Sequence, residues 1–260
     1  MNIISYPPIL DSYSTLQLRE EVDYLYPIGT NKWIGIYDEP ENTVEKYIQD
    51  SFDLYLKDQY ALWHNVNPWN PLGEPIGFEW WIHDTCDYNT ITYHSNHDDA
   101  YRREEHGIMR YPLLSTEIYL TNNEDPTTIL DTKHGDYWEE FVDFPPKEIA
   151  YSVPEEGKFL VTDPRHIRGV FDSLPNRLTL HYDVWHYKPK NLNRVGISTE
   201  IFDCRFYKHT GYTPVNYLGK TKQGKMNLWD KTFTKHQPIS YNSGETWKVC
   251  LLYTSDAADD

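Results

Sequence analysis

The stretch from Gly77 to Trp185 is divided into short apolar or alternating runs by turn-forming residues. Thr, Tyr, Ile and Trp, which favour pleated strands, are frequent in these runs. The runs are GFEWWIH, NTITYHSNHD, PLLSTEIYL, TTIL, KFLVTD and RLTLHYDVW. Short runs at fairly regular spacing predict antiparallel strands that pack as a sandwich or close as a barrel. We therefore expect a mainly β fold rather than a helix bundle.

Helices are expected only before this stretch. A short helix is predicted over residues 14–24. A longer one begins near Asn42, where Asn42 and Glu45 have the spacing of a capping box, and extends to about Trp63. Val44 and Ile48 recur on one face of this second helix. We interpret residues 1–76 as an N-terminal helical buttress that supports the sheet.

The rest of the chain divides by composition. A length of 260 residues allows one sizeable core, and we expect one domain with appendages. The β core covers residues 77–189, and a basic C-terminal extension, residues 190–249, packs on it. The last eleven residues, CLLYTSDAADD, resemble the translation of a sequencing adapter. Residues 250–260 are therefore excluded from fold reasoning as not native, and we expect the true C-terminus to lie beyond Val249.

The charge of the chain limits its partners. A formal net charge of −16 argues against general nucleic-acid binding, because a phosphate backbone repels an acidic surface. The extension is an exception, with ten Lys and Arg against four Asp and Glu, a net charge of +6. Packing of this basic segment on the acidic body is the main interpretation, and anion binding is the alternative.

Cysteine content and the N-terminus indicate the compartment. Three scattered cysteines are too few for a disulfide framework or a cysteine zinc site. The N-terminus has no basic region followed by an apolar run, and no stretch approaches the length that crosses a bilayer. We expect a cytoplasmic protein without a membrane partner.

Two histidines and one carboxylate in the strand region form a candidate metal face. Residues two apart on a strand point to the same side, so His97 and Asp99 would share a face and Asp98 would point to the other. His166 follows an apolar strand and an Asp-Pro break, an arrangement that could deliver a third ligand from across a barrel. Two imidazoles and one carboxylate suit a divalent metal with open coordination positions.

Arg177 lies eleven positions after His166, on a probable strand where Arg177, Thr179 and His181 alternate toward one side. A buried guanidinium without an anionic partner is costly. Its position therefore requires either a ligand carboxylate, which it could hold by two parallel hydrogen bonds, or an internal Asp or Glu.

The order of these elements resembles the iron(II)- and 2-oxoglutarate-dependent dioxygenases over roughly residues 80–185. The matching elements are HDD at 97–99, STEIYLTN, PEEGKFLVTDPRHIRGV and RLT at 177–179. Thr127-Thr128 stands where the family has paired glycines, which leaves the strand register there open. The resemblance implies a double-stranded β-helix, a cupin-like jelly roll, as the catalytic core.

The resemblance also implies the chemistry. His97, Asp99 and His166 would bind iron(II) and leave three positions for 2-oxoglutarate and O2. The cosubstrate would be oxidatively decarboxylated to succinate and CO2, and a C–H bond of a small molecule or protein side chain would be hydroxylated. Related halogenases have Gly or Ala at the position of the metal carboxylate, so Asp99 favours hydroxylation.

Three further residues receive roles from the same resemblance. Arg177 would pair with the remote carboxylate of 2-oxoglutarate, Thr179 would donate a hydroxyl to that carboxylate, and Tyr119 would do likewise. These residues lie on two of the predicted strands.

Several alternatives stay open at this level. His94 or Asp98 could replace a named ligand if the strand register differs. The other histidines, His134 and His181 among them, are interpreted as core or surface residues. A cupin-type metal enzyme that does not use 2-oxoglutarate and a non-catalytic jelly-roll binding module are the rival functions. The sequence leaves the substrate, whether small molecule or peptide, and the oligomeric state undetermined.

Overall fold

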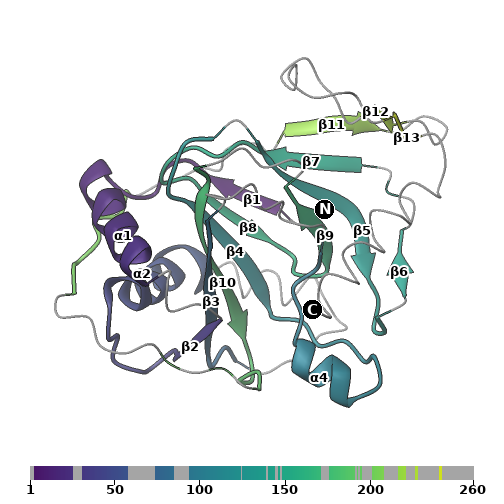
Figure 1. Ribbon diagram of the computed structural model, residues 1–260, viewed down its shortest axis with the longest axis horizontal. Coiled ribbons are helices and arrows are strands. Elements are labelled where there is room, and N and C mark those ends of the chain that lie inside the picture. The colour runs from purple at the N-terminus through teal and green to yellow at the C-terminus, as the bar shows by residue number, and fades with distance from the viewer. Residues whose placement is uncertain are drawn as a thin grey trace.

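The computed structural model describes residues 3–25, 31–57, 74–84, 94–123, 125–138, 140–143, 146, 148–170, 176–190, 192, 194 and 201–207, and the strands at 216–220, 226–227 and 240–241. The fold is mainly β, with antiparallel sheets and few helices, as the sequence runs predicted (Figure 1). The end of the second predicted helix after residue 57 and the tail at 250–260 lie outside the described residues. Within the described ranges, no helix is long and apolar enough to cross a membrane.

The larger sheet has six strands in the order β1-β8-β4-β10-β3-β2. Their bounds are Ile3–Tyr6 for β1, Phe159–Thr162 for β8, Leu114–Tyr119 for β4, Leu178–Trp185 for β10, Gly77–Asp84 for β3 and Lys32–Gly35 for β2. All neighbours in this sheet are antiparallel. The N-terminal segment thus provides both edge strands, β1 and β2, as well as helices, and the sequence analysis did not predict those two strands.

The second sheet has the strand order β11-β7-β5-β6, and β9 also pairs with β5. The bounds are Asn216–Lys220 for β11, Glu148–Ser152 for β7, Thr127–His134 for β5, Phe141–Val142 for β6 and His166–Gly169 for β9. A further pair of short strands, β12 (Met226–Asn227) and β13 (Ser240–Tyr241), forms a sheet of its own. Between β4 and β10 the chain passes from one sheet to the other more than once.

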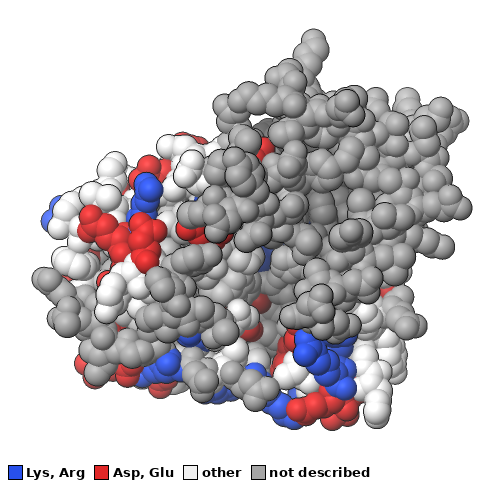
Figure 2. Space-filling view, in the orientation of Figure 1, with Lys and Arg blue, Asp and Glu red and all other residues white. Residues whose placement is uncertain are grey.

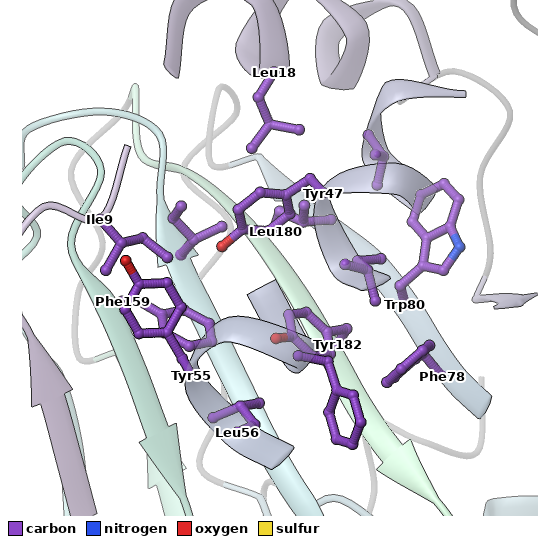
Figure 3. Close-up of a cluster of buried hydrophobic side chains, with 14 of the residues drawn as sticks. Ile9, Leu18, Tyr47, Tyr55, Leu56, Phe78, Trp80, Phe159, Leu180 and Tyr182 are labelled. Atoms are coloured by element: carbon purple, nitrogen blue, oxygen red, sulfur yellow. The ribbon is translucent and has the colours of Figure 1, made fainter. Parts of the chain in front are cut away.

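Two helices cover the outer face of the six-stranded sheet (Figure 1). They are α1 (Ser12–Leu25) and α2 (Thr43–Ser51), and α2 continues into a π-helical turn, η2 (Phe52–Leu56). As the capping-box spacing predicted, the Asn42 side chain accepts a hydrogen bond from the Glu45 backbone N–H at 2.8 Å. The helices and the sheet enclose the main apolar core, part of which is drawn in Figure 3.

Strand β10 separates this apolar core from the layer between the sheets. Its even-numbered residues, among them Leu180 and Tyr182, belong to the apolar core beneath the helices. The Tyr182 hydroxyl lies 2.9 Å from the Ser51 hydroxyl on α2. The odd-numbered residues Thr179, His181 and Asp183 are equally buried but polar, and Trp185 ends the strand. Because side chains alternate along a strand, the polar set points to the opposite face, toward the second sheet.

The first residues of the basic extension contact acidic residues of the body. Arg194 forms ion pairs with Glu41 at 3.2 Å and Glu45 at 3.1 Å, and Lys190 contacts Glu104. Further along, the backbone of Tyr207 donates to the Ile9 carbonyl at 2.8 Å. The described part of this segment is therefore joined to the N-terminal region by charge pairs and by backbone hydrogen bonds.

Candidate active site between the two sheets

His97 and Asp99 lie side by side at the start of helix α4 (Asp99–Glu104), with His97 Nε2 2.9 Å from Asp99 Oδ1. The expected reason for this proximity is wrong, because Asp99 opens a helix and does not lie on a strand. Asp98 is the N-cap of that helix, and its carboxylate accepts from the Tyr101 N–H at 2.9 Å. Asp98 is thereby held by the helix and by the Tyr187 hydroxyl at 3.2 Å.

The surroundings of Asp99 keep it negatively charged. Burial acts to raise its pKa, but the hydrogen bond and charge of His97, together with Arg102, outweigh burial and lower the pKa to about 2. Arg102 approaches Asp99 at 3.1 Å and also lies over the Trp138 ring at 4.2 Å. Figure 2 shows basic and acidic side chains beside one another where α4 lies in Figure 1. Asp99 is thus available as a carboxylate at neutral pH.

The geometry of the pair fits two adjacent ligands of an octahedral ion. Two donor atoms about 2.1 Å from such an ion and at a right angle to each other are about 3.0 Å apart. The observed separation of 2.9 Å between His97 Nε2 and Asp99 Oδ1 is close to that value. His97 Nδ1 lies 3.0 Å from the Ser95 carbonyl, so Nδ1–H can donate there, and Nε2 is the ring nitrogen that faces Asp99.

His166 lies on β9 and is almost completely buried. Neither ring nitrogen has a hydrogen bond of normal geometry, although the Leu130 carbonyl is close enough to affect its pKa. Burial lowers that pKa to about 4, with Asp163 acting in the opposite direction. The ring is therefore neutral at pH 7, the form that binds metals. Among the described residues, however, no three His, Cys, Asp or Glu side chains lie together as a metal site, so His166 is not beside the His97–Asp99 pair.

Arg177 has an internal acid as its partner, one of the two possibilities that its buried position required. Its Nη2 donates to Glu117 Oε1 at 2.6 Å and to the Thr127 hydroxyl at 2.6 Å, and its Nη1 donates to the Asp125 carbonyl at 2.5 Å. The side chains of Arg177 and Glu117 are only 1% and 2% exposed. A ligand carboxylate at Arg177 would therefore have to compete with Glu117.

Tyr119 and Thr179 are fully buried in the same layer. The Tyr119 hydroxyl donates to Thr127 Oγ1 at 2.9 Å, and the Arg177 guanidinium lies 5.3 Å from the centre of the Tyr119 ring. The Thr179 hydroxyl lies 2.9 Å from His181 Nε2. Both hydroxyls thus take part in hydrogen bonds within the protein.

The structure also places Arg168, His181 and Asp183 in this layer, three residues that were not among the predicted site residues. Arg168 is 5% exposed, and its Nη1 donates to the Thr162 hydroxyl at 2.8 Å. Asp183 accepts from the Asn96 amide at 2.9 and 3.0 Å. Strand alternation could have identified all three, because Arg168 lies two positions after His166, and His181 and Asp183 continue the series that begins at Arg177.

Burial controls the protonation of these groups. It raises the pKa of Asp183 to about 6, although the positive charge of Arg168 acts in the opposite direction. It lowers the pKa of His181 and of His83 well below the usual range. The charges of Arg168 and Arg177 add to this effect at His181, whereas Glu117 opposes it at His83. At neutral pH the layer therefore contains neutral imidazoles next to permanently charged arginines.

No protein-family model and no curated protein matches this chain. The solved structures to which it is similar include 2OG-Fe(II) oxygenases. A Pseudomonas putida prolyl-4-hydroxylase is 14% identical, with 72% of this chain and 88% of that chain covered and a TM-score of 0.43. An oxidoreductase of the 2OG-Fe(II) oxygenase family from Burkholderia pseudomallei is 13% identical, with 74% and 88% covered and a TM-score of 0.41.

A third similar structure is the epimerase SnoN in complex with Fe3+, alpha ketoglutarate and nogalamycin RO. It is 11% identical, with 81% of this chain and 92% of that chain covered and a TM-score of 0.41.

Proposed function

We propose that the protein is an iron(II)- and 2-oxoglutarate-dependent oxygenase that hydroxylates a C–H bond of a small molecule or a peptide side chain. The His97–Asp99 pair carries this proposal, because its donor atoms are 2.9 Å apart and its carboxylate is ionised. When bound, iron(II) and 2-oxoglutarate would supply O2 activation and would release succinate and CO2. Two imidazoles and one carboxylate are the ligand set that such iron enzymes use.

Each residue has a defined task in this proposal. His97 would bind the ion through Nε2 while its Nδ1–H is oriented by the Ser95 carbonyl, and Asp99 would provide the negative charge. His166 would be the third ligand, since it is buried, neutral and without a hydrogen bond of normal geometry. Completing the site requires His166 on β9 to come together with the pair at the start of α4.

The course of the chain supports a double-stranded β-helix as the fold of the core. Strands β4, β8 and β10 lie in the larger sheet; the strands between β4 and β8, which are β5, β6 and β7, and the strand between β8 and β10, which is β9, lie in the second sheet. A bridge between His94 and Arg168 joins the segment before β4 to the second sheet as well. In a jelly roll of this kind, the ligands project into the interior between the sheets.

The test is anaerobic addition of iron(II) and then 2-oxoglutarate, followed by visible absorption spectroscopy of the chelate. We expect a charge-transfer band that is lost in His97→Ala, Asp99→Ala and His166→Ala. The matched control is His106→Asn, because His106 is exposed and has a φ of 52°, which Asn tolerates. Absence of the band in the wild-type protein, or its persistence in His97→Ala, would contradict the proposal.

A metal enzyme of the cupin type that does not use 2-oxoglutarate is the second candidate. The Arg177–Glu117 ion pair favours it, because the arginine expected to bind the cosubstrate already has an internal carboxylate. The anaerobic addition of iron(II) and then 2-oxoglutarate distinguishes this cupin-type enzyme from the 2-oxoglutarate-dependent oxygenase. Binding of iron(II) that depends on His97 and Asp99, without a band on addition of 2-oxoglutarate, would favour the second.

A further inference from the structure

We propose that the layer between the sheets contains a binding site for a ligand carboxylate at Arg168, and that Arg177 is a structural arginine. This assignment of the ligand rests on the proposed function. If the protein uses 2-oxoglutarate, the carboxylate bound at Arg168 is the one farthest from the keto group. The ligand class is a short dicarboxylate whose second end points toward the candidate metal ligands.

Arg168 differs from Arg177 in how its guanidinium is satisfied. Nη1 of Arg168 donates to the Thr162 hydroxyl, but the buried Nη2 has no hydrogen-bond partner in the structure. Arg177, by contrast, donates to an internal carboxylate, a hydroxyl and a carbonyl. A buried guanidinium nitrogen without an acceptor carries a large desolvation cost, which a ligand carboxylate would remove.

Asp183, the acid on which the charge of Arg168 acts, does not accept a hydrogen bond from Arg168 Nη2. The Asp183 carboxylate accepts hydrogen bonds from the Asn96 amide at 2.9 and 3.0 Å and from the Ser115 side chain. Asp183 therefore interacts with Arg168 electrostatically but forms no hydrogen bond with Arg168 Nη2. An additional anion would meet a guanidinium donor that no internal group uses.

Two imidazoles, those of His83 and His181, lie side by side on β3 and β10, and His181 is close enough to Arg168 to be affected by its charge. His83 Nδ1 and His181 Nδ1 are buried and lack a hydrogen-bond partner, and their rings are 4.6 Å apart. Trp81 stacks on His181 at 5.3 Å with an interplanar angle of 7°. A neutral imidazole can donate from Nδ1 while the Thr179 hydroxyl donates to Nε2, so His181 can offer a second N–H to an anion.

The position of Arg168 in the chain connects this site to the candidate metal ligands. Arg168 and His166 lie two residues apart on β9, and both pair with the same strand, β5. Their side chains therefore point to the same side of the second sheet, although the register shifts between them. His94, which forms a bridge with Arg168, precedes His97 by three residues. A dicarboxylate at Arg168 would thus extend along β9 toward His166.

The experiment is isothermal titration calorimetry of the full chain under anaerobic conditions, with 2-oxoglutarate and succinate as probes, each with and without iron(II). We expect Arg168→Gln to weaken the binding of both probes about 100-fold, because a charged hydrogen-bond pair is lost. Arg177→Gln should change their affinity by less than about threefold while lowering the melting temperature. If Arg168→Gln does not fold, Arg168→Lys serves instead, with an expected loss of about tenfold, since lysine keeps the charge but not the planar fork.

Two results would overturn the proposal: loss of binding in Arg177→Gln with binding retained in an Arg168 variant, or no binding of either probe to the wild-type protein at millimolar concentration. Failure of the proposed function gives a different result. In that case succinate and 2-oxoglutarate bind in an Arg168-dependent manner, but iron(II) and 2-oxoglutarate produce no charge-transfer band.

Discussion

The Arg177–Glu117 ion pair provides a direct test of how the interior is stabilised. We predict that Glu117→Gln, which keeps the shape and one acceptor oxygen but removes the charge, destabilises the protein substantially. The two side chains are 1% and 2% exposed, and Nη2 and Oε1 are 2.6 Å apart. Removing one partner of such a pair leaves a buried charge uncompensated, which costs about 3 to 5 kcal/mol. Because Gln still accepts a hydrogen bond, we expect the lower value, about 3 kcal/mol.

The effect is large enough to measure by thermal unfolding. A loss of 1 kcal/mol lowers the melting temperature of a chain of this size by about 2 to 4 °C, so we expect a decrease of about 10 °C for Glu117→Gln. The double variant, in which Arg177→Gln accompanies Glu117→Gln, should recover most of this loss because no buried charge remains.

The matched control is Asp53→Asn on the protein surface. Asp53 and Lys57 form an ion pair at 3.3 Å, but their side chains are 63% and 69% exposed. We expect a change below about 0.5 kcal/mol there, because solvent screens exposed pairs. A decrease of less than 1 °C for Glu117→Gln, or no recovery in the double variant, would refute the reasoning and would return Arg177 to the role of a ligand-binding residue.

Three further predictions concern stability. The raised pKa of Asp183, about 6, means that the folded state binds a proton more tightly than the unfolded state. The unfolding free energy relative to Asp183→Asn should therefore fall by about 3 kcal/mol as the pH rises from below 4 to above 6, as measured by urea titration. Asn42→Ala should cost about 1 kcal/mol through loss of the N-cap, whereas Asn42→Asp should be nearly neutral. Gly157→Ala should cost about 1 kcal/mol or more, because Gly157 has a φ of +80°; an unchanged melting temperature would contradict this.

Several of the described strands lie where the sequence shows an apolar or alternating run. Strands β3, β4, β5, β8 and β10 correspond to such runs. Strands β1 and β2 have only four residues each and lie in the N-terminal segment, for which the sequence predicts helices. Their places at the edges of the sheet come from pairing with β8 and β3, which are distant in sequence.

Local capping chemistry explains why the expected strand at residues 97–99 is absent. The alternating pattern favoured a strand, but Asp98 accepts a hydrogen bond from the Tyr101 N–H and starts helix α4. Aspartate at this position stabilises the first turn of a helix, so capping outweighed alternation. His97 and Asp99 nevertheless lie together, because the turn into the helix returns the Asp99 carboxylate to the imidazole.

The partner of Arg177 shows where sequence reasoning reaches its limit. Burial of a guanidinium requires an anion, and this requirement could be stated from the sequence alone. The choice of Glu117 could not, because 60 residues separate the two and their contact depends on how β4 and β10 pair. Arg168 was recognisable as a neighbour of His166 on one strand face, but its unbonded Nη2 appears only when the surrounding strands are in place.

Strand β10 is buried along its whole length, with Leu178, Leu180, Tyr182 and Val184 on one face and the polar residues Thr179, His181 and Asp183 on the other. A deletion of one residue within it would exchange the two faces of the part beyond the deletion. If the deletion preceded these residues, the side chains of His181 and Asp183 would point into the apolar core beneath α1 and α2. The side chain of Tyr182 would point into the polar layer between the sheets. The strand can therefore accept substitutions but not changes in length, and insertions in related chains should be confined to the loops at its two ends.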